Sequence, residues 1–272
     1  MPRRATPKSS GGKNAISKAA AKLRLLKKLK CTTRFEKAAW DTGARLIAGV
    51  DEVGRGSLFG PVVAGAVILD PNYRIKGLRD SKLLPASRRE QLAKRIREHS
   101  IAYAIAAVDV ARIDQLNIYW ASQLAMVEAV SKLVTKPDHL LIDAMSIPYE
   151  CSQTKIIHGD ALSASIAAAS IIAKVERDAM MREWDPIYPQ YGLASNKGYY
   201  TQKHLKSLRE HGPSPLHRQS FAPVWNSTAG QAMLGFMLED DEAPEAALQA
   251  LASEELGSSE ELGETVLIAG ES

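Results

Sequence analysis

The feature that most constrains this chain is a pair of adjacent acids, Asp51 and Glu52, which end an apolar, strand-like run that starts at Leu46. A second apolar run, residues 62–69, follows after a short glycine-rich segment. Burying an unpaired carboxylate is energetically costly, so a buried strand has no structural use for two in a row. A divalent cation held by both would offset that cost. The pair therefore predicts a cation-binding site where this strand ends.

The segment between the two apolar runs carries Gly54-Arg55-Gly56. Glycine has no side chain, so backbone N–H groups at these positions can come close to a bound molecule. The same three residues could also form a tight turn with no further role, and the two interpretations are compatible. A lone pair of acids is usually a surface pair or a helix cap, so the prediction depends on the combination of these residues.

Two further acids follow strand-like runs later in the chain. Asp143 ends an apolar run at residues 139–143, and Asp160 stands between a strand-like run at residues 154–157 and an alanine-rich segment. Functional side chains collect at such ends because a rigid scaffold positions them. Structural roles are open as well: Asp143 could cap its strand, and Asp160 could be the N-cap of a helix that starts at residue 161, where aspartate is favoured.

Four carboxylates around one point favour Mg²⁺ or Mn²⁺ over zinc, because these ions prefer oxygen ligands. They suit two ions that together stabilise the attacking and leaving oxygens of an in-line displacement, which predicts phosphodiester hydrolysis. One geometric difficulty is that neighbouring residues of a strand face opposite sides. Asp51 and Glu52 can share a site only where the strand ends or twists, and the glycines at positions 54 and 56 favour an early break.

Periodicity of apolar residues predicts the secondary structure of the chain's middle part. The strands are expected over residues 46–53, 61–69, 101–110, 139–143 and 154–157. The helices are expected over residues 112–134, 161–181 and 201–210, with a basic helix over residues 16–30. Strands first, followed by alternating strands and helices, imply a mixed sheet with helices packed on it.

Taken together, these residues resemble the ribonuclease HII family, the type 2 ribonucleases H of bacteria. The likeness extends over residues 44–224, and its blocks occur in the family's order and at similar separations. The blocks are residues 47–69, 140–144 (Leu-Leu-Ile-Asp-Ala), 158–163 (His-Gly-Asp-Ala-Leu-Ser) with 168–174, 196–199 (Asn-Lys-Gly-Tyr) and 217–221 (His-Arg-Gln-Ser-Phe). The joint match is far more specific than any single block.

The resemblance implies the α/β ribonuclease H-like fold, a mixed five-stranded sheet flanked by helices with a small helical C-terminal part. It implies a metal-dependent endoribonuclease that cleaves the RNA strand of RNA–DNA hybrids. It also implies incision 5′ to a single ribonucleotide in duplex DNA. Two other functions stay open: a different nuclease of this fold, and a non-catalytic nucleic-acid-binding protein. The glycine–arginine block argues against the first, and the full set of acids argues against the second.

The resemblance also implies a role for each candidate residue. The acids implied to be catalytic and to hold two Mg²⁺ or Mn²⁺ ions are Asp51, Glu52, Asp143 and Asp160, with Asp51 between the ions. Gly54, Arg55 and Gly56 are implied to read the 2′-hydroxyl beside the cut phosphate, the group that distinguishes RNA from DNA. Tyr199 is implied to stack on the sugar of the deoxynucleotide that follows.

Four positions depart from the family's usual pattern. Ser57 and Phe59 stand where Pro and Ala are more common, and His158 stands where Lys often precedes Gly-Asp. Tyr200 stands where Gly is common after the stacking tyrosine, and it could alter the turn beside Tyr199. None of the four is an expected metal ligand.

The charge along the chain is uneven although the net charge is only +4. Residues 1–38 carry twelve Lys or Arg and one acid, whereas residues 226–272 carry eleven acids and no Lys or Arg. We therefore expect a basic, partly disordered arm over 1–38, a ribonuclease H type 2 domain over 39–225 and an acidic, mostly disordered tail over 226–272. The arm is either a solvated segment or one that grips nucleic acid through phosphate contacts.

The two cysteines, Cys31 and Cys151, lie far apart and lack metal-type spacing, which favours a reducing cytosol over a disulfide framework. The apolar runs are shorter than a membrane span, and the N-terminus lacks the apolar core of a secretory signal. We expect a cytoplasmic monomer whose partners are RNA–DNA hybrid and ribonucleotide-containing duplex DNA, with no membrane.

Overall fold

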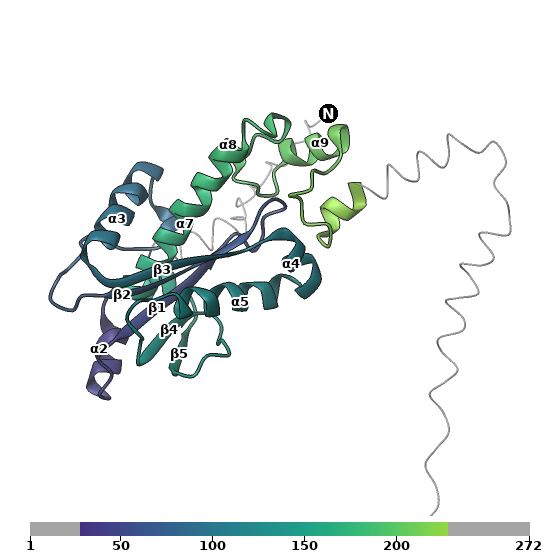
Figure 1. Ribbon diagram of the computed structural model, residues 1–272. Coiled ribbons are helices and arrows are strands. Elements are labelled where there is room, and N and C mark those ends of the chain that lie inside the picture. The colour runs from purple at the N-terminus through teal and green to yellow at the C-terminus, as the bar shows by residue number, and fades with distance from the viewer. Residues whose placement is uncertain (1–27, 228–272) are drawn as a thin grey trace, which may run out of the picture. The chain divides into compact units, whose positions relative to one another are not determined.

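A computed structural model of the protein describes residues 28–227. At its centre is a five-stranded sheet with the strand order β3-β2-β1-β4-β5 (Figure 1). The strands are β1 (Ile47–Val53), β2 (Val62–Leu69), β3 (Ser100–Val108), β4 (His139–Asp143) and β5 (Ser152–Ile156). Antiparallel pairs join β1 to β2 and β2 to β3, and parallel pairs join β1 to β4 and β4 to β5. The mixed five-stranded sheet expected from the sequence is confirmed.

Helices cover both faces of this sheet (Figure 1). On one face lie α3 (Ala86–His99) and α7 (Ala164–Trp184), which pack with Val67 of β2. On the other face lie α4 (Val110–Leu116) and α5 (Ile118–Ser131), which form the largest apolar cluster with the inner strands. Two buried apolar layers therefore hold the central strands rigidly, and the ends of those strands become fixed points for functional side chains.

Small residues bring α7 unusually close to the sheet. A side chain at Gly49 of β1 would put its Cβ 2.0 Å from the carbonyl carbon of Ser165, and one at Gly65 of β2 would come 2.6 Å from the carbonyl oxygen of Ala169. Real Cβ atoms do not approach backbone so closely, so both strands need glycine where the alanine-rich helix crosses them. This contact places the start of α7, and the residues just before it, beside the end of β1.

Two segments that periodicity predicts as single helices are each broken in two. Residues 112–134 divide at Asn117, which adopts a left-handed conformation (φ 68°) and accepts hydrogen bonds from the N–H groups of Tyr119 and Trp120. Residues 161–181 divide at Ser163, between α6 (Gly159–Leu162) and α7. In each case a polar side chain caps the second helix, and the apolar period continues across the break.

The C-terminal part of the described chain consists of short helices around a small apolar cluster that contains Phe59. These are η2 (Pro189–Tyr191), α8 (Leu193–Asn196) and α9 (Gln202–His211). Close to residue 28, α2 (Arg34–Asp41) packs against β1 and β4. The short helix η1 (Ser81–Leu83) precedes α3. Most of the basic arm and nearly all of the acidic tail lie outside the described residues. No helix within residues 28–227 is long and apolar enough to cross a membrane.

Candidate active site

The first two acids of the site come from neighbouring parallel strands. The register of β1 and β4 pairs Val50 with Ile142, so Asp51 and Asp143 follow side by side. β1 does not break early at the glycines; it continues, paired with β2, to Val53. Because β4 ends at Asp143, β1 continues past Asp51 without a paired strand on that side among residues 28–227. Asp51 and Glu52 can therefore both approach Asp143 although they belong to one strand.

The fourth acid is brought in by α6. The N–H of Gly159 donates a 2.7 Å hydrogen bond to Oδ1 of Asp143, which fixes the first turn of α6 against the end of β4. Asp160 then lies close enough to Asp51 and Asp143 to interact with both electrostatically. The interpretation of Asp160 as an N-cap is wrong, because His158 stands at the cap position of α6 and Ser163 caps α7. The carboxylate of Asp160 faces the other acids instead.

Burial and mutual repulsion raise the pKa values of three of these carboxyls. Asp51 is 4% exposed, and its pKa is raised well above the ordinary value by burial first and then by Glu52, Asp143 and Asp160. Burial raises the pKa of Glu52 to about 7 against the opposing effect of Arg55, with a further contribution from Asp143. Burial and Asp160 likewise raise the pKa of Asp143. Asp51, Glu52 and Asp143 therefore hold their protons more tightly than free carboxyls do, and a nearby positive charge would favour their ionised forms.

A lysine that the sequence did not single out supplies part of that charge. Nζ of Lys82, in η1, lies 2.9 Å from Oδ2 of Asp160 and 4.0 Å from Oδ1 of Asp80. Burial opposes the charge on Lys82, but Asp160, Asp51 and Asp80 together raise its pKa. Its side chain is 70% exposed, so the ammonium reaches the acids from the solvent side. The sequence shows only an isolated acid and lysine in a loop, and nothing marks their position.

The donor set fits a hard divalent cation in its chemistry. All its ligands are carboxylate oxygens, which Mg²⁺ and Mn²⁺ prefer. Oε2 of Glu52 is buried and has no hydrogen-bond partner among residues 28–227, and a cation would satisfy it and relieve the raised pKa values. As they stand, no three acidic, histidine or cysteine side chains within residues 28–227 enclose an ion. Lys82, the N–H of Gly159 and the N–H of Glu52 each engage one oxygen of Asp160, Asp143 and Asp51, and each carboxylate has a second oxygen with which it could ligate a cation.

Residues 54–61, which follow Asp51 and Glu52 in the sequence, lie against residues 196–199. We call these two segments the paired loops. Ser57 and Tyr199 form an isolated antiparallel bridge, and the N–H of Leu58 donates to the carbonyl of Gly198 at 2.9 Å. Nη1 of Arg55 contacts Oε1 of Glu52 at 3.3 Å. The glycine–arginine segment and Tyr199, which lie far apart in the sequence, are therefore neighbours in space.

A buried arginine holds the paired loops together. Arg177 of α7 is fully buried, and all four of its hydrogen bonds go to neutral oxygens. It donates to the carbonyls of Pro61, Lys197 and Phe59 at 2.9 to 3.0 Å and to Oγ of Ser57 at 2.7 Å. Ser57, one of the departures from the family's pattern, thus accepts from the arginine and bonds the facing loop. A guanidinium suits this role because its donors form a rigid planar fork.

Tyr199 is held from two further directions. Its ring lies 5.4 Å from Nζ of Lys174 and 5.4 Å from Cζ of Arg177. Its carbonyl accepts from Nδ1 of His204, whose Nε2 lies 3.0 Å from Nε2 of His217. The N–H of Ser214 donates to Nδ1 of His217, so His217 carries its proton on Nε2 and His204 on Nδ1. Burial lowers the pKa of both histidines, which fits this chain of neutral hydrogen bonds.

The two glycines of the glycine–arginine segment differ in what they need. Gly54 has φ +94°, and a Cβ there would lie 2.2 Å from Nε of Arg177, so the fold itself requires glycine. At Gly56, which is exposed, no atom of the described protein lies within 4 Å of an added Cβ. Packing therefore does not explain Gly56, whereas the approach of an external molecule would.

Comparison with known proteins bears on this arrangement. Residues 48–224 match the family model described as Ribonuclease HII. The chain belongs to the ribonuclease HII family. A ribonuclease HII from Koribacter versatilis (strain Ellin345) is 76% identical over 225 residues, which are 83% of this chain and 89% of that protein. One from Solibacter usitatus (strain Ellin6076) is 53% identical over 197 residues, 72% of this chain and 86% of that protein.

Solved structures agree with this family. The crystal structure of ribonuclease H2 from Pyrococcus horikoshii OT3 is 25% identical, with a TM-score of 0.58, and the match covers 67% of this chain and 97% of that one. A structure of Bst-RNase HIII in complex with Mn²⁺ shares the fold at 22% identity and a TM-score of 0.55, covering 71% of this chain and 72% of that one. As a member of the ribonuclease HII family with this fold, the protein is a ribonuclease H endonuclease.

Within this ribonuclease HII scaffold, every residue that the sequence predicted for the site lies in one region. The four acids converge from β1, β4 and α6, and the paired loops follow them. Sequence reasoning missed Lys82, Asp80 and Arg177, and it noted Ser57 only as a departure from the family's pattern. The sequence gives no signal for Arg177, because it stands in a charged stretch of α7 between Glu176 and Asp178.

Proposed function

We propose that this chain hydrolyses the RNA strand of RNA–DNA hybrids and incises duplex DNA on the 5′ side of a single embedded ribonucleotide, in a metal-dependent reaction. The observation that supports this most is the convergence of four acids from three separate segments beside a glycine-bounded loop. The raised pKa values of Asp51, Glu52 and Asp143 fit acids that work with bound cations.

Asp51, Glu52, Asp143 and Asp160 are proposed to hold two Mg²⁺ or Mn²⁺ ions. When bound, such a pair stabilises the attacking and leaving oxygens of an in-line displacement at phosphorus, which would leave 3′-hydroxyl and 5′-phosphate ends. The Mn²⁺ complex of Bst-RNase HIII, a relative in fold, supports the choice of ion. Until an ion arrives, Lys82 neutralises part of the acids' charge and limits their repulsion.

The paired loops are proposed to select the substrate. Gly54, Arg55 and Gly56 follow the acids immediately, so a nucleotide whose phosphate meets the acids would place its sugar near this segment. The open space at Gly56 leaves room for a backbone N–H to meet a 2′-hydroxyl, the group that marks RNA. Tyr199, bridged to Ser57, is proposed to stack on the deoxyribose that follows the junction.

The test compares three duplexes of one sequence: one with a single ribonucleotide, one long RNA–DNA hybrid and one of DNA alone. Each is incubated with the full chain in Mg²⁺, in Mn²⁺ and in chelator, and the ends produced are mapped. We expect cleavage of the first two with either ion, incision 5′ to the ribonucleotide, and no product in chelator.

The other outcomes separate the alternatives. Equal cleavage of the all-DNA duplex would support a different nuclease with the same acidic core. Binding of all three duplexes without cleavage under any condition would support a non-catalytic nucleic-acid-binding protein. The monomeric state and the role of the basic arm stay predictions, which sedimentation and a deletion of residues 1–27 would test.

A further inference from the structure

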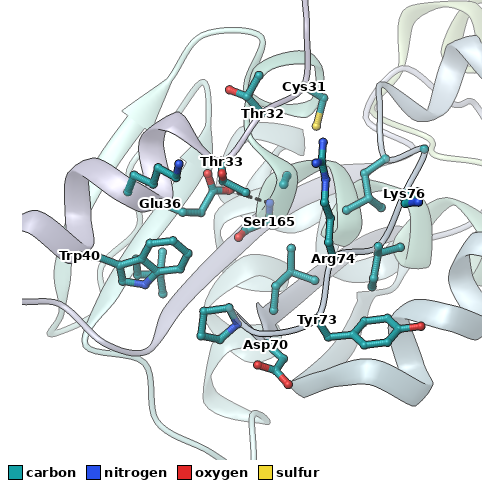
Figure 2. A pocket seen from close by; sticks show the side chains of 18 of the residues that line it. Cys31, Thr32, Thr33, Glu36, Trp40, Asp70, Tyr73, Arg74, Lys76 and Ser165 are labelled. Atoms are coloured by element: carbon teal, nitrogen blue, oxygen red, sulfur yellow. Dashed lines mark hydrogen bonds between the residues drawn. The ribbon is translucent and has the colours of Figure 1, made fainter.

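A cavity of about 530 Å³ lies between α2, the start of α7 and the loop that joins β2 to α3 (Figure 2). Ile47 and Leu69 in its wall stand at the opposite end of the central strands from Asp51. None of the four acids of the active site lines it. The volume is typical of a site for a small molecule. The cavity is therefore distinct from the proposed catalytic centre and large enough for a ligand.

One wall holds a buried carboxylate with a free acceptor. Glu36 of α2 is 2% exposed. Its Oε1 accepts from Oγ of Ser163 at 2.7 Å. It also accepts from the N–H of Ser165 at 2.8 Å, the contact drawn in Figure 2, and the two bonds tie α2 to the start of α7. Its Oε2 is buried and has no hydrogen-bond partner in the described part of the chain. An unsatisfied buried acceptor is costly, so a donor group on a ligand would relieve it.

The rest of the polar lining is mostly cationic. Lys37, Arg45, Arg74 and Lys76 line the cavity, and within residues 28–227 none of them forms an ion pair. Exposed lysines elsewhere, such as Lys94, do pair with nearby acids. Four unpaired cations outweigh the two acids of the lining, Glu36 and Asp70, so the cavity attracts an anion.

Two aromatic side chains stand at the sides of the cavity, with Arg74 between them in the view of Figure 2. They are Trp40 of α2 and Tyr73 of the opposite loop. The ring of Tyr73 stacks on His99 with centroids 4.0 Å apart, which leaves its other face uncovered by that contact. Flat aromatic faces suit a nucleobase, because stacking tolerates every base.

We propose that this cavity binds one nucleotide, with its phosphate toward Arg74 and Lys76 and an N–H donor of its base toward Oε2 of Glu36. This chemistry is shared by a free mononucleotide and by an unpaired nucleotide at the end of a nucleic-acid strand. The second source is near the site, because Thr32 in the wall donates its N–H at 3.0 Å to the carbonyl of Leu162 in α6, the short helix that carries Asp160.

The first experiment titrates the full chain with guanosine 5′-monophosphate, ribose 5-phosphate and inorganic phosphate by calorimetry. We expect saturable binding of one nucleotide, at least tenfold tighter than either probe that lacks the base. Arg74→Ala should weaken it about tenfold or more, in line with losing one charge-assisted contact. The matched control is Lys94→Ala, a lysine exposed outside the cavity, which should bind as the unchanged protein does.

Glu36→Gln addresses the base contact, and a circular-dichroism melt checks that the variant is folded. Folded Glu36→Gln should keep ribose 5-phosphate binding and lose the advantage of the nucleotide over it. Nucleotide binding that is equally tight in Arg74→Ala, or the absence of saturable heat up to millimolar concentrations, would overturn the proposal. So would equal affinity for nucleotide and inorganic phosphate.

A second arm distinguishes the two sources. Cleavage of a hybrid with blunt ends is compared with cleavage of the same hybrid carrying a short single-stranded overhang, in unchanged protein and Arg74→Ala. If Arg74→Ala raises KM for the overhang substrate alone, the site is assigned to strand ends. If Arg74→Ala leaves both KM values unchanged but weakens binding of the mononucleotide, the site is assigned to free nucleotide. The calorimetric titration of the first experiment needs no catalysis, so it tests nucleotide binding even if the proposed ribonuclease function fails.

Discussion

The acidic end of β1 and the paired loops lie next to each other, yet they are built on opposite principles. At the acidic end, a buried oxygen of Glu52 lacks a hydrogen-bond partner in the part of the chain that the structure describes, and burial together with repulsion between carboxylates raises the pKa values of Asp51 and Glu52. In the paired loops, the fully buried Arg177 gives its hydrogen bonds to oxygens of both loops. The first region is electrostatically unfavourable as it stands, and the second is already held together by hydrogen bonds.

The difference separates two properties of neighbouring regions: the charge state of the carboxylates can change, whereas hydrogen bonds fix the positions of the loops. The carboxylates of Asp160, Asp143 and Asp51 would respond to an ion, because their partners are Lys82 and two backbone N–H groups. Loops proposed to recognise a sugar by position would gain from rigidity, because a misplaced contact loses its selectivity. Substitutions in the two regions should therefore have opposite effects on stability.

Asp51→Asn gives the largest expected effect. Removing the charge proposed to lie between the ions should lower kcat by roughly a thousandfold or more, while the fold survives. The same change should raise the free energy of unfolding of the metal-free protein at neutral pH, because it removes one of the repelling charges. Single-turnover cleavage and chemical denaturation in chelator measure the two quantities. Near-normal turnover in a folded variant would refute the role of Asp51.

Arg177→Lys tests the preassembled region. One ammonium cannot reach four acceptors arranged for a planar fork, so buried carbonyls lose partners and stability should fall by about 2–4 kcal/mol. Urea denaturation measures this, with Arg182→Lys, an exposed arginine of the same helix, as the control expected within about 0.5 kcal/mol of the unchanged protein. Equal stability of both variants would show that Arg177 does not hold the loops together.

The two glycines of the loop separate folding from recognition. Gly54→Ala should destabilise the protein by about 3 kcal/mol, because φ +94° is strained for alanine and its Cβ meets Arg177. Gly56→Ala should leave stability within about 0.5 kcal/mol and raise KM on ribonucleotide-containing duplex, because only an external molecule meets the new methyl. Thermal melts and steady-state kinetics measure both. Unchanged kinetics in Gly56→Ala would contradict the recognition role.

Tyr199→Ala should mainly affect junction substrates. Loss of stacking should lower kcat/KM on a duplex with a single ribonucleotide by about tenfold, with a smaller loss on a long hybrid. Tyr200→Ala, a neighbour that is 55% exposed, is the matched control and should cleave both substrates normally. If Tyr199→Ala lost both activities equally, stacking at the junction would not be its role.

The smallest expected effect is a pH dependence confined to the acidic region. The pKa of Glu52 is raised in the folded protein to about 7 from an unfolded value of 4.5, and the pKa of Asp51 is raised in the same direction. The stability contributed by their protonated forms is full below pH 4.5 and is lost as the pH rises through about 7. The melting temperature of the metal-free protein should therefore fall as the pH rises across this range, and added Mg²⁺ should raise it again. A flat profile in chelator would show that the pKa values of these acids are not raised in the folded protein.

Much of the fold could be predicted because strands and helices follow from the spacing of apolar residues that are close in the sequence. The apolar runs at residues 46–53, 61–69 and 139–143 lie within about a residue of their strands, and the acids at their ends meet because β1 and β4 are parallel neighbours. The helix breaks at Asn117 and Ser163 were missed because the apolar period runs through both. Their cause is a capping side chain, a signal that the amino-acid types allowed but did not require.

The sequence by itself determined the acids, their order and the strands that carry them, since alternation and apolar runs are properties of neighbouring residues. Only the tertiary structure decided which charges meet. Lys82 contacts Asp160 across 78 positions, and Arg177 contacts Ser57 across 120. The cavity beside Glu36 likewise exists because α2 docks on α7. Such encounters depend on how whole elements pack, and no local pattern encodes the distance between side chains so far apart in the chain.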